Sequence, residues 1–155
     1  MKEMANQKVN TKVLFVCIHN TCRSVMAEAI FNSLAKRWRA ESAGIEAAEK
    51  LDLIALDVIR SRGYRIEKTK PTKLENVQLE DYRLVVTVCD EAGCVNIHHP
   101  NVERWYLEDP RGKSREAYER VFDELETKVK ELLKRIEDKN GVIEEIKEIK
   151  DVEDG

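Results

Sequence analysis

A cysteine stands six residues before an arginine, at the point where a short apolar run ends. The stretch VLFVCIHNTCRS, residues 13–24, places four apolar residues before Cys17 and ends on Arg23 and Ser24. A thiolate is a strong nucleophile, and a guanidinium binds two oxygens of a tetrahedral anion at once. These residue types in this order predict nucleophilic attack on an oxyanion that is held in a loop.

The segment after Cys17, which we call the anion loop, has the backbone that such chemistry needs. Its amide hydrogens are expected to point inward, and a helix that begins near Ser24 adds the positive end of its dipole. This field stabilises a thiolate at Cys17, and the Ser24 hydroxyl can stabilise the sulfur as a leaving group. The anion loop consists of Ile18, His19, Asn20, Thr21, Cys22, Arg23 and Ser24.

A carboxyl group is expected to complete this site from far downstream. Asp109 and Pro110 follow the last apparent strand, and the proline restricts Asp109 to extended backbone. A carboxylic acid held over the anion loop protonates a departing oxygen. Asp-Pro alone is a common turn, so the prediction of a general acid depends on the cysteine loop.

Strands and helices alternate along the chain and must position these groups. Short apolar runs predict strands at 13–16, 39–43, 84–88 and 102–107. Apolar residues at helical spacing predict helices over 24–37, 52–63 and 114–137. The segment 64–80 has neither period and predicts a surface loop.

This alternation predicts an α/β fold with an open parallel sheet, which binds ligands at the carboxyl ends of its strands. Cys17 and Cys89 each follow a predicted strand directly, so we expect both at that edge. A length of 155 residues fits one domain. We expect a flexible extension over 1–11, the α/β domain over 12–137 and a charged tail over 138–155.

Composition excludes several classes of protein. A net charge of -3 without a dominant basic run argues against a nucleic-acid binder. No apolar run reaches the roughly 18 residues of a membrane span, and no signal-peptide core is present, so we predict a cytoplasmic protein. A charged fraction of 37%, mainly Glu, Lys and Arg, is typical of thermophiles.

Five stretches carry a resemblance to a known group of enzymes. They are VCIHNTCRSVMAEAIFNSL, ESAGIEA, VVTVC, ERWYLEDPRGKS and AYERVFDEL, within residues 12–137. Together they resemble the superfamily of low-molecular-weight protein tyrosine phosphatases, which includes thioredoxin-coupled arsenate reductases. The resemblance implies a four-stranded parallel sheet with helices on both faces. It also implies that Cys17 is the nucleophile, Arg23 the anion-binding arginine, Asn20 the residue that shapes the loop, Ser24 the thiolate-stabilising serine and Asp109 the general acid.

The other cysteines favour the reductase branch. Cys89 and Cys94 are separated by four residues, and a reductase needs two such thiols. In this mechanism Cys17 attacks arsenate, Cys89 attacks the Cys17 sulfur and releases arsenite, and Cys94 leaves a Cys89–Cys94 disulfide. By resemblance a thioredoxin-like protein reduces that disulfide. We expect no cofactor and no metal.

Two departures from the families bear on this choice. Reductases of this kind often have a proline directly after the third cysteine, where Val95 stands here. Phosphatases of this fold usually place paired aromatics after Asp-Pro, where this chain has Arg111-Gly112-Lys113. A phosphatase acting on phosphotyrosine or small phosphate esters through a Cys17 thiophosphate is the alternative, and a non-catalytic redox or anion sensor is a third hypothesis.

Two local alternatives concern the remaining thiols. Cys22 either protects Cys17 through a reversible disulfide or is a small residue that fits the loop. Four further side chains form a chemically complete zinc ligand set, although their spacing matches no common zinc finger. They are Cys89, Cys94, His98 and His99.

Overall fold

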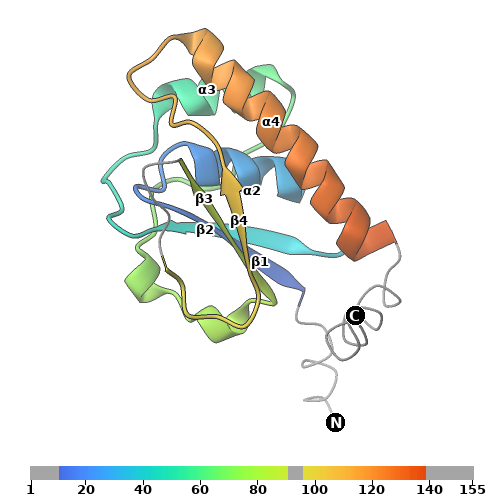
Figure 1. Cartoon of the computed structure of the whole chain (residues 1–155). Helices are drawn as coiled ribbons and strands as arrows, with labels where there is room; N and C mark the ends of the chain where they lie inside the picture. The colour runs from blue at the N-terminus through green and yellow to red at the C-terminus, as the bar shows by residue number, and fades with distance from the viewer. Residues whose placement is uncertain (1–10, 91–95, 139–155) are drawn as a thin grey trace.

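The chain alternates strands and helices in the order that the sequence predicts. A computed structural model describes residues 11–90 and 96–138 (Figure 1). The elements are β1 (Lys12–Cys17), α2 (Arg23–Leu34), β2 (Arg39–Gly44), α3 (Leu53–Ser61), the 3-10 helices η1 (Leu74–Asn76) and η2 (Leu79–Asp81), β3 (Leu84–Cys89), β4 (Val102–Tyr106), α4 (Arg115–Leu133) and a π-helical turn η3 (Lys134–Asp138). The predicted strands and helices are all present, with bounds that differ by a few residues.

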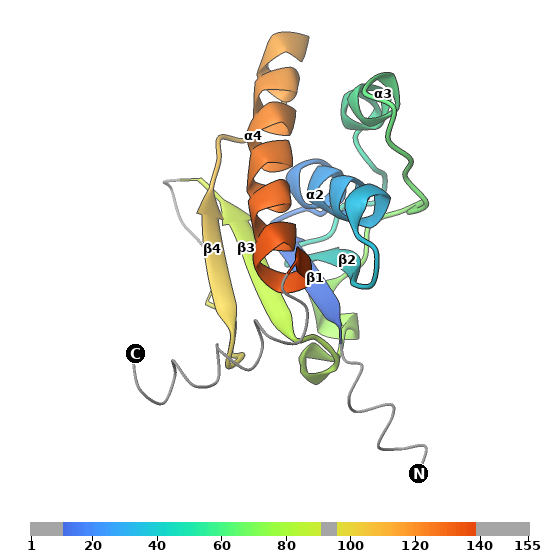
Figure 2. The ribbon, with the colours of Figure 1, turned by 90° about the vertical axis from the view of Figure 1, so that its right-hand side faces the viewer.

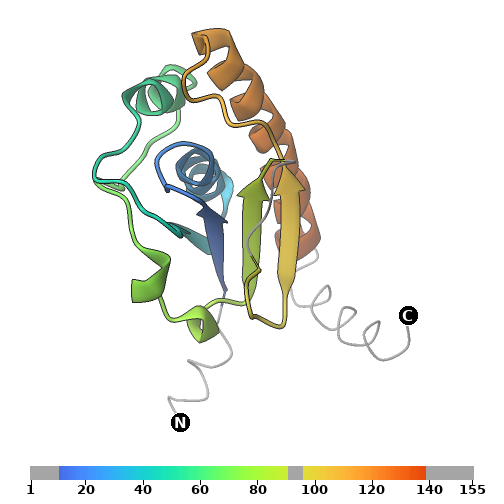
Figure 3. The ribbon, with the colours of Figure 1, turned by 60° about the vertical axis from the view of Figure 1, so that its left-hand side comes forward.

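The strands form one parallel sheet in the order β2-β1-β3-β4. The central strand β1 is buried from Val13 to Val16, as a wholly apolar strand in a parallel sheet must be. Figure 3 shows the arrowheads of β1, β3 and β4 directed toward the edge where the loop after β1 lies. At that edge Cys17 pairs with Gly44, and Cys89 pairs with Tyr106. The predicted open four-stranded parallel sheet is confirmed.

The two faces of the sheet are covered differently. Helices α2, α3 and α4 lie together on one face (Figure 2) and bury an apolar cluster that includes Phe15, Phe31 and Phe122. The apolar cluster on the other face is smaller, and Leu74 of η1 and Leu79 of η2 pack against it. Helical segments therefore lie on both faces, as predicted, but those on the second face are single 3-10 turns.

Two helices begin at predicted positions, and the third does not. The Asp52 carboxylate accepts hydrogen bonds from the first backbone amides of α3, and Ser114 caps α4 in the same way. Helix α2 begins at Arg23, and Cys22 at its N-cap makes no side-chain capping bond. Ser24, where the predicted helix begins, has the residue type of a cap, but it does not cap α2, because its hydroxyl bonds the Cys17 sulfur instead.

The segment 64–80 does more than connect two elements across the surface. Tyr64 and Ile66 pack against the larger apolar cluster. The amide of Gly44 donates to the carbonyl of Thr72 at 2.9 Å. No residue of 64–80 is buried, so the segment lies at the surface as predicted, and backbone bonds of this kind hold it in place without any periodic pattern.

Predictions for the ends of the chain fall mostly outside the described residues. The N-terminal extension, 1–11, and the C-terminal tail, 138–155, lie there except for Thr11 and Asp138. Over the ranges 11–90 and 96–138, no helix is both long and apolar enough to cross a membrane.

Candidate oxyanion site

The carbonyl groups of the anion loop all turn toward one neighbouring segment. The carbonyls of Cys17, Ile18, His19 and Thr21 accept hydrogen bonds from backbone amides within 45–52. In a trans peptide the carbonyl and the next amide point in opposite directions, and no cis peptide occurs in the described chain. The amides that follow these carbonyls therefore face the other way, toward the inside of the loop. This arrangement forms a cradle of N–H donors for an anion, as the sequence predicts.

The first turn of α2 adds to this cradle. Because Cys22 contributes no capping bond, the amides at the start of α2 have no side-chain cap. A helix N-terminus in this condition attracts negative charge through its dipole. The cradle and the helix end together create a positive field at Cys17.

The Cys17 sulfur is hydrogen-bonded to Ser24. It lies 2.9 Å from the Ser24 hydroxyl oxygen, and both residues are buried. The Asn20 side-chain amide donates to that same oxygen at 2.8 Å. The Ser24 hydroxyl can accept from Asn20 and at the same time donate its proton to a Cys17 thiolate, which can only accept. A hydrogen bond to the charged form stabilises it, so the Asn20–Ser24 pair supports a thiolate nucleophile.

Asn20 fixes the shape of the loop through its backbone conformation and through both polar atoms of its side-chain amide. Its backbone has φ 54°, a left-handed conformation that asparagine tolerates better than most residues. Its side-chain oxygen accepts from the Thr72 amide at 2.8 Å. Thr72 also accepts a hydrogen bond from Lys68, at 2.9 Å. Sequence reasoning missed Thr72 and Lys68, because a contact made through one backbone amide leaves no pattern in the sequence.

Gly44 is the residue that lets strand β2 approach the loop. A Cβ built on it would lie 2.8 Å from backbone atoms of Ile18, His19 and Asn20. These atoms belong to the cradle itself and cannot move without deforming it. The glycine is therefore required by close approach.

We expect Gly44→Ala to disturb the loop. The added methyl should lower the free energy of unfolding by about 1–3 kcal/mol through overpacking and reduce kcat/KM at least about tenfold. Urea denaturation and steady-state kinetics measure the two effects. Gly63→Ala is the matched control, because Gly63 has a positive φ but open space around its Cα. The control should lose stability and keep its kcat/KM, and equal kinetic losses in both variants would contradict the close-approach argument.

Arg23 is buried and is held by the chain that follows β4. Its Nη1 donates to the Leu107 carbonyl at 2.9 Å, and its Nη2 lies 3.7 Å from Asp109 Oδ2. The side chain of Arg23 is 5% exposed, and that of Asp109 is 23% exposed. The structure thus brings Cys17, Arg23 and Asp109 to one place, as the sequence predicts, across more than 80 residues of chain.

Asp109 is also bound by Arg111. The Arg111 side chain donates to both carboxylate oxygens, at 2.8–3.1 Å, and its backbone amide donates to Oδ1 at 3.2 Å. Burial by itself would raise the pKa of Asp109, but the hydrogen bonds from Arg111 and the charges of Arg23 and Arg111 outweigh it and lower the pKa. Asp109 is therefore a carboxylate at neutral pH in this arrangement.

The pocket above Cys17 is small. It is lined by Cys17, His19, Thr21, Cys22, Arg23, Asp109 and Arg111. Its volume is about 10 Å³, the space of roughly one water molecule. A tetrahedral oxyanion is larger than that, so side chains that line the pocket must shift when such an anion binds.

Cys22 is a buried neutral thiol. Burial raises the pKa of Cys22 well above its usual range, and the Asp52 carboxylate, the Cys17 sulfur and the Asp109 carboxylate raise it further. Arg23 opposes the shift but does not cancel it. Cys17 and Cys22 are both free thiols in the structure. The two roles proposed for Cys22, as a protecting thiol and as a small loop residue, stay predictions.

The difference between the two thiols predicts selective labelling. Iodoacetamide at about neutral pH should modify Cys17, which lines the pocket, and leave Cys22 unmodified, because a raised pKa removes the reactive thiolate. Peptide mapping of the native and the urea-unfolded protein measures the modification at each position. Cys22 should become reactive only after unfolding. Labelling of both thiols at the same rate in the native protein would contradict this assignment.

Cys89 differs from these two thiols because it is disulfide-bonded. It is 5% exposed at the end of β3. Side chains alternate between the two faces along a strand, so Cys89 lies on the same face of the sheet as Val85. Cys17 belongs to the apolar cluster on the opposite face. Cys94, the third cysteine of the expected relay, lies outside the described residues.

Of the residues considered for a zinc site, His99 is engaged in other contacts. His99 uses both ring nitrogens, with Nε2 at 2.8 Å from the Tyr82 carbonyl and Nδ1 accepting from the Asn101 amide at 2.9 Å. Within the described ranges, no three His, Cys, Asp or Glu side chains are grouped to hold a metal ion. The contacts of His99 argue against zinc there.

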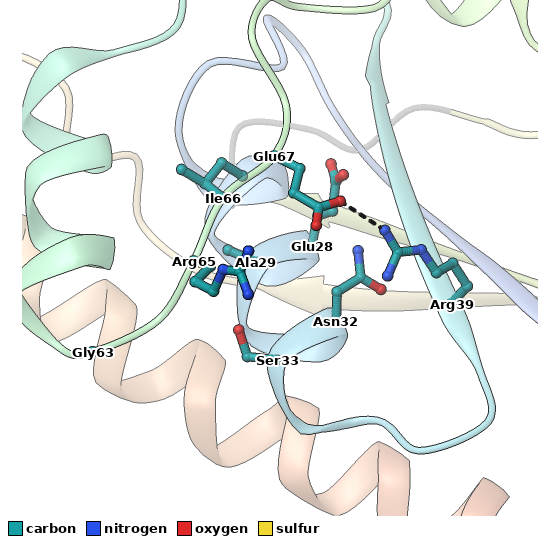
Figure 4. Close-up of a pocket in the computed structure, with 9 residues that line it drawn as sticks. All are labelled: Glu28, Ala29, Asn32, Ser33, Arg39, Gly63, Arg65, Ile66 and Glu67. Atoms are coloured by element: carbon teal, nitrogen blue, oxygen red, sulfur yellow. Dashed lines mark hydrogen bonds and ion pairs between the residues drawn. The ribbon is translucent and has the colours of Figure 1, made fainter.

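A second cavity, of about 320 Å³, lies away from the anion loop (Figure 4). It is formed by α2, β2 and the chain after α3, and an Arg39–Glu67 ion pair spans it. Burial raises the pKa of Glu28 in its wall. The residues that line it include no cysteine and no residue of the loop, so nucleophilic chemistry is not expected there.

The fold and the loop define a class of enzyme that attacks tetrahedral oxyanions with a cysteine. The sequence pattern of the low molecular weight phosphotyrosine protein phosphatases matches residues 12–142. The chain belongs to this family, and it is an enzyme.

Relatives within the family include reductases and phosphatases. The glutaredoxin arsenate reductase of Synechocystis is 33% identical, over 81% of this chain and 98% of the relative. An arsenate reductase from Archaeoglobus fulgidus is 50% identical with a TM-score of 0.74, over 78% and 98% of the two chains. A low molecular weight protein tyrosine phosphatase from T. tengcongensis is 27% identical with a TM-score of 0.70, over 81% and 99%.

Proposed function

We propose that this enzyme reduces arsenate to arsenite by a relay of three thiols, Cys17, Cys89 and Cys94. The observation that carries the proposal is the state of the cysteines: Cys89 is disulfide-bonded, and Cys17 on the anion loop is a free thiol. This is the state expected after a relay has transferred oxidation away from the nucleophile. The relatives that are named arsenate reductases support the same reaction.

The first step joins arsenate to Cys17. The loop amides and Arg23 bind the oxygens, and the Cys17 thiolate attacks arsenic. One arsenic–oxygen bond breaks as the sulfur–arsenic bond forms, and Asp109 donates the proton with which that oxygen leaves as water. Because Asp109 is a carboxylate before the anion binds, it must first gain a proton.

The next two steps move electrons between sulfur and arsenic. The Cys89 thiolate attacks the Cys17 sulfur, the sulfur–arsenic bond breaks, and its electron pair stays on arsenic, which leaves as arsenite. The Cys94 thiolate then attacks Cys89 in the Cys17–Cys89 disulfide and releases Cys17 as a thiolate. Two thiols have been oxidised and arsenic has gained two electrons, so the sequence balances.

The relay requires a movement at the end of β3. While Cys89 is disulfide-bonded, it lies on the face of the sheet opposite to Cys17. Reduction of that disulfide must therefore precede a turn of Cys89 toward the anion loop. This requirement links each turnover to an external reductant.

The reductant is a small dithiol protein of the thioredoxin or glutaredoxin kind. The thioredoxin type is the proposal from sequence, and the name of the Synechocystis relative favours glutaredoxin. Both act where thiols are kept reduced, so we propose a cytoplasmic enzyme. Arsenite formation should be measured with thioredoxin and its reductase, and separately with glutaredoxin and glutathione. Multiple turnovers with either system support the proposal, and arsenite formation with neither contradicts it.

Phosphatase activity is the second candidate, and the family itself favours it. Cys17 would then form a thiophosphate, and Asp109 would act first as acid and then as base. The residues after Asp109 favour the reductase instead, because charged Arg111 and Lys113 line the neighbouring surface where an aryl ring would need an apolar wall. Hydrolysis of p-nitrophenyl phosphate measures this activity. A redox or anion sensor, the third hypothesis, would turn over neither substrate.

A further inference from the structure

Arg111 and Asp109 form a closed pair at the mouth of the oxyanion pocket. The guanidinium contacts both carboxylate oxygens, at 2.8–3.1 Å, and the Arg111 backbone amide contacts one of them. Both side chains also line the pocket above Cys17. Arg111 is therefore part of the site, and its guanidinium binds the Asp109 carboxylate.

The same carboxylate engages the anion-binding arginine from the loop. Arg23 Nη2 lies 3.7 Å from Asp109 Oδ2, and its Nη1 is anchored on the Leu107 carbonyl. Asp109 thus pairs with two guanidinium groups, those of Arg23 and Arg111, to which an oxyanion would also bind. Since the pocket holds only about 10 Å³, an incoming anion must displace the carboxylate from at least one of them.

We propose that Arg111 is a positioning residue that holds the Asp109 carboxylate over the loop before substrate binds and then transfers to the oxyanion, so that Asp109 takes up a proton. The inference rests on the proposed function only in that the site takes a tetrahedral oxyanion. The exchange makes Asp109 an acid when a substrate is present. It therefore supplies the proton that the first chemical step requires.

The charges around Asp109 give the direction of this effect. Before binding, Arg23 and Arg111 hold the pKa of Asp109 low, so the carboxylate is ionised at neutral pH. After the exchange it faces an anion and has lost a guanidinium, and both changes raise its pKa. Binding therefore takes up protons at pH values between these two pKa values. The other titratable groups near Asp109 come from the loop region, the start of α3, the ends of β3 and β4, the chain around Asp109 and α4. They are Cys17, His19, Cys22, Asp52, Asp90, Tyr106, Glu108, Lys113 and Tyr118.

Sulfate is a suitable probe because it is a tetrahedral dianion that does not itself titrate near neutral pH. Calorimetry in buffers of different ionisation enthalpy, over about pH 5 to 7, gives both its affinity and the number of protons taken up. The wild-type protein should take up protons when sulfate binds, and Asp109→Asn should not. Asp109→Asn should also bind sulfate about tenfold more tightly, because the competing carboxylate is gone.

The role of Arg111 is isolated in the Asp109→Asn background. Adding Arg111→Ala there should weaken sulfate binding about tenfold, the value of one charge-assisted bidentate contact. Arg62→Ala is the matched control, because Arg62 pairs with Asp123 away from the loop, and it should change neither affinity nor proton uptake. His19→Gln excludes the imidazole as the source of the uptake, which should persist in that variant.

The outcomes separate this inference from the proposed function. If sulfate binds the wild type without proton uptake, or if the double variant binds it as tightly as Asp109→Asn does, the exchange by Arg111 is wrong and the oxyanion site stands. If sulfate does not bind at all, the oxyanion site itself is wrong, and both proposals fall. Loss of arsenate reduction in a Cys89 variant has no effect on this test, because sulfate binding uses no thiol relay.

Discussion

Cys17→Ser should abolish both arsenate reduction and aryl phosphate hydrolysis, with kcat falling at least about 10⁴-fold in each assay. The loop field and the Ser24 hydroxyl favour an anionic sulfur, but a serine hydroxyl in the same place stays protonated and is a poor nucleophile. The same variant should still bind sulfate, because Arg23 and the loop amides are unchanged.

Cys22→Ala is the control for that variant. It removes the other buried thiol of the loop, which is neutral and plays no part in the proposed steps. Its kcat should stay within about threefold of the parent in both assays. Substantial turnover by Cys17→Ser, with the fold intact by circular dichroism, would show that Cys17 is not the nucleophile.

Cys89→Ser should separate the two reactions that the family performs. Arsenate turnover should fall at least about 10³-fold, because the sulfur–arsenic adduct on Cys17 then has no thiol to break it. Hydrolysis of p-nitrophenyl phosphate should remain within about twofold of the parent, since a thiophosphate is resolved by water and not by a second thiol. Parallel assays of arsenite and p-nitrophenol on one preparation measure both effects.

Cys94→Ser refines this test. The variant should release one equivalent of arsenite in a single turnover and stop as a Cys17–Cys89 disulfide, because Cys89 is present but its partner is not. Arsenate reduction by Cys89→Ser at the parent rate would rule out the three-thiol relay. The same result for Cys94→Ser under multiple turnover would remove Cys94 from it.

The chemistry of the site was largely predictable, because its residues lie in one short stretch. Cys17 and Arg23 flank a loop between a buried strand and a helix, and Asp109 follows the last strand before a proline. Parallel strands bring such residues to one edge whatever the length of chain between them, so a distant carboxyl could be placed over the loop.

The supporting contacts were not predictable from the sequence. Gly44 matters because a Cβ would meet the loop backbone, and Thr72 because its backbone amide bonds Asn20. Backbone contacts of this kind leave no signature in residue type. The function of Arg111 was not apparent either, because its importance depends on the direction in which one flexible side chain extends.

The start of α2 shows where a local rule gave way to the site. Ser24 has the residue type of a helix cap, but its hydroxyl serves the Cys17 sulfur, and α2 begins one residue earlier. The shared edge of Cys17 and Cys89 followed from topology. The two cysteines lie on opposite faces of the sheet because side chains alternate along each strand, and this placement depends on the exact register of the two strands.

The measurement that tests the central claim most directly is a thiol map after one turnover. Fully reduced protein is mixed with arsenate, and separately with phosphate, without added reductant, and each cysteine is then assigned by mass spectrometry. The account predicts that arsenate consumes two thiols, at Cys89 and Cys94, while Cys17 and Cys22 stay free and phosphate changes nothing. Survival of all four thiols in the presence of arsenate would contradict it.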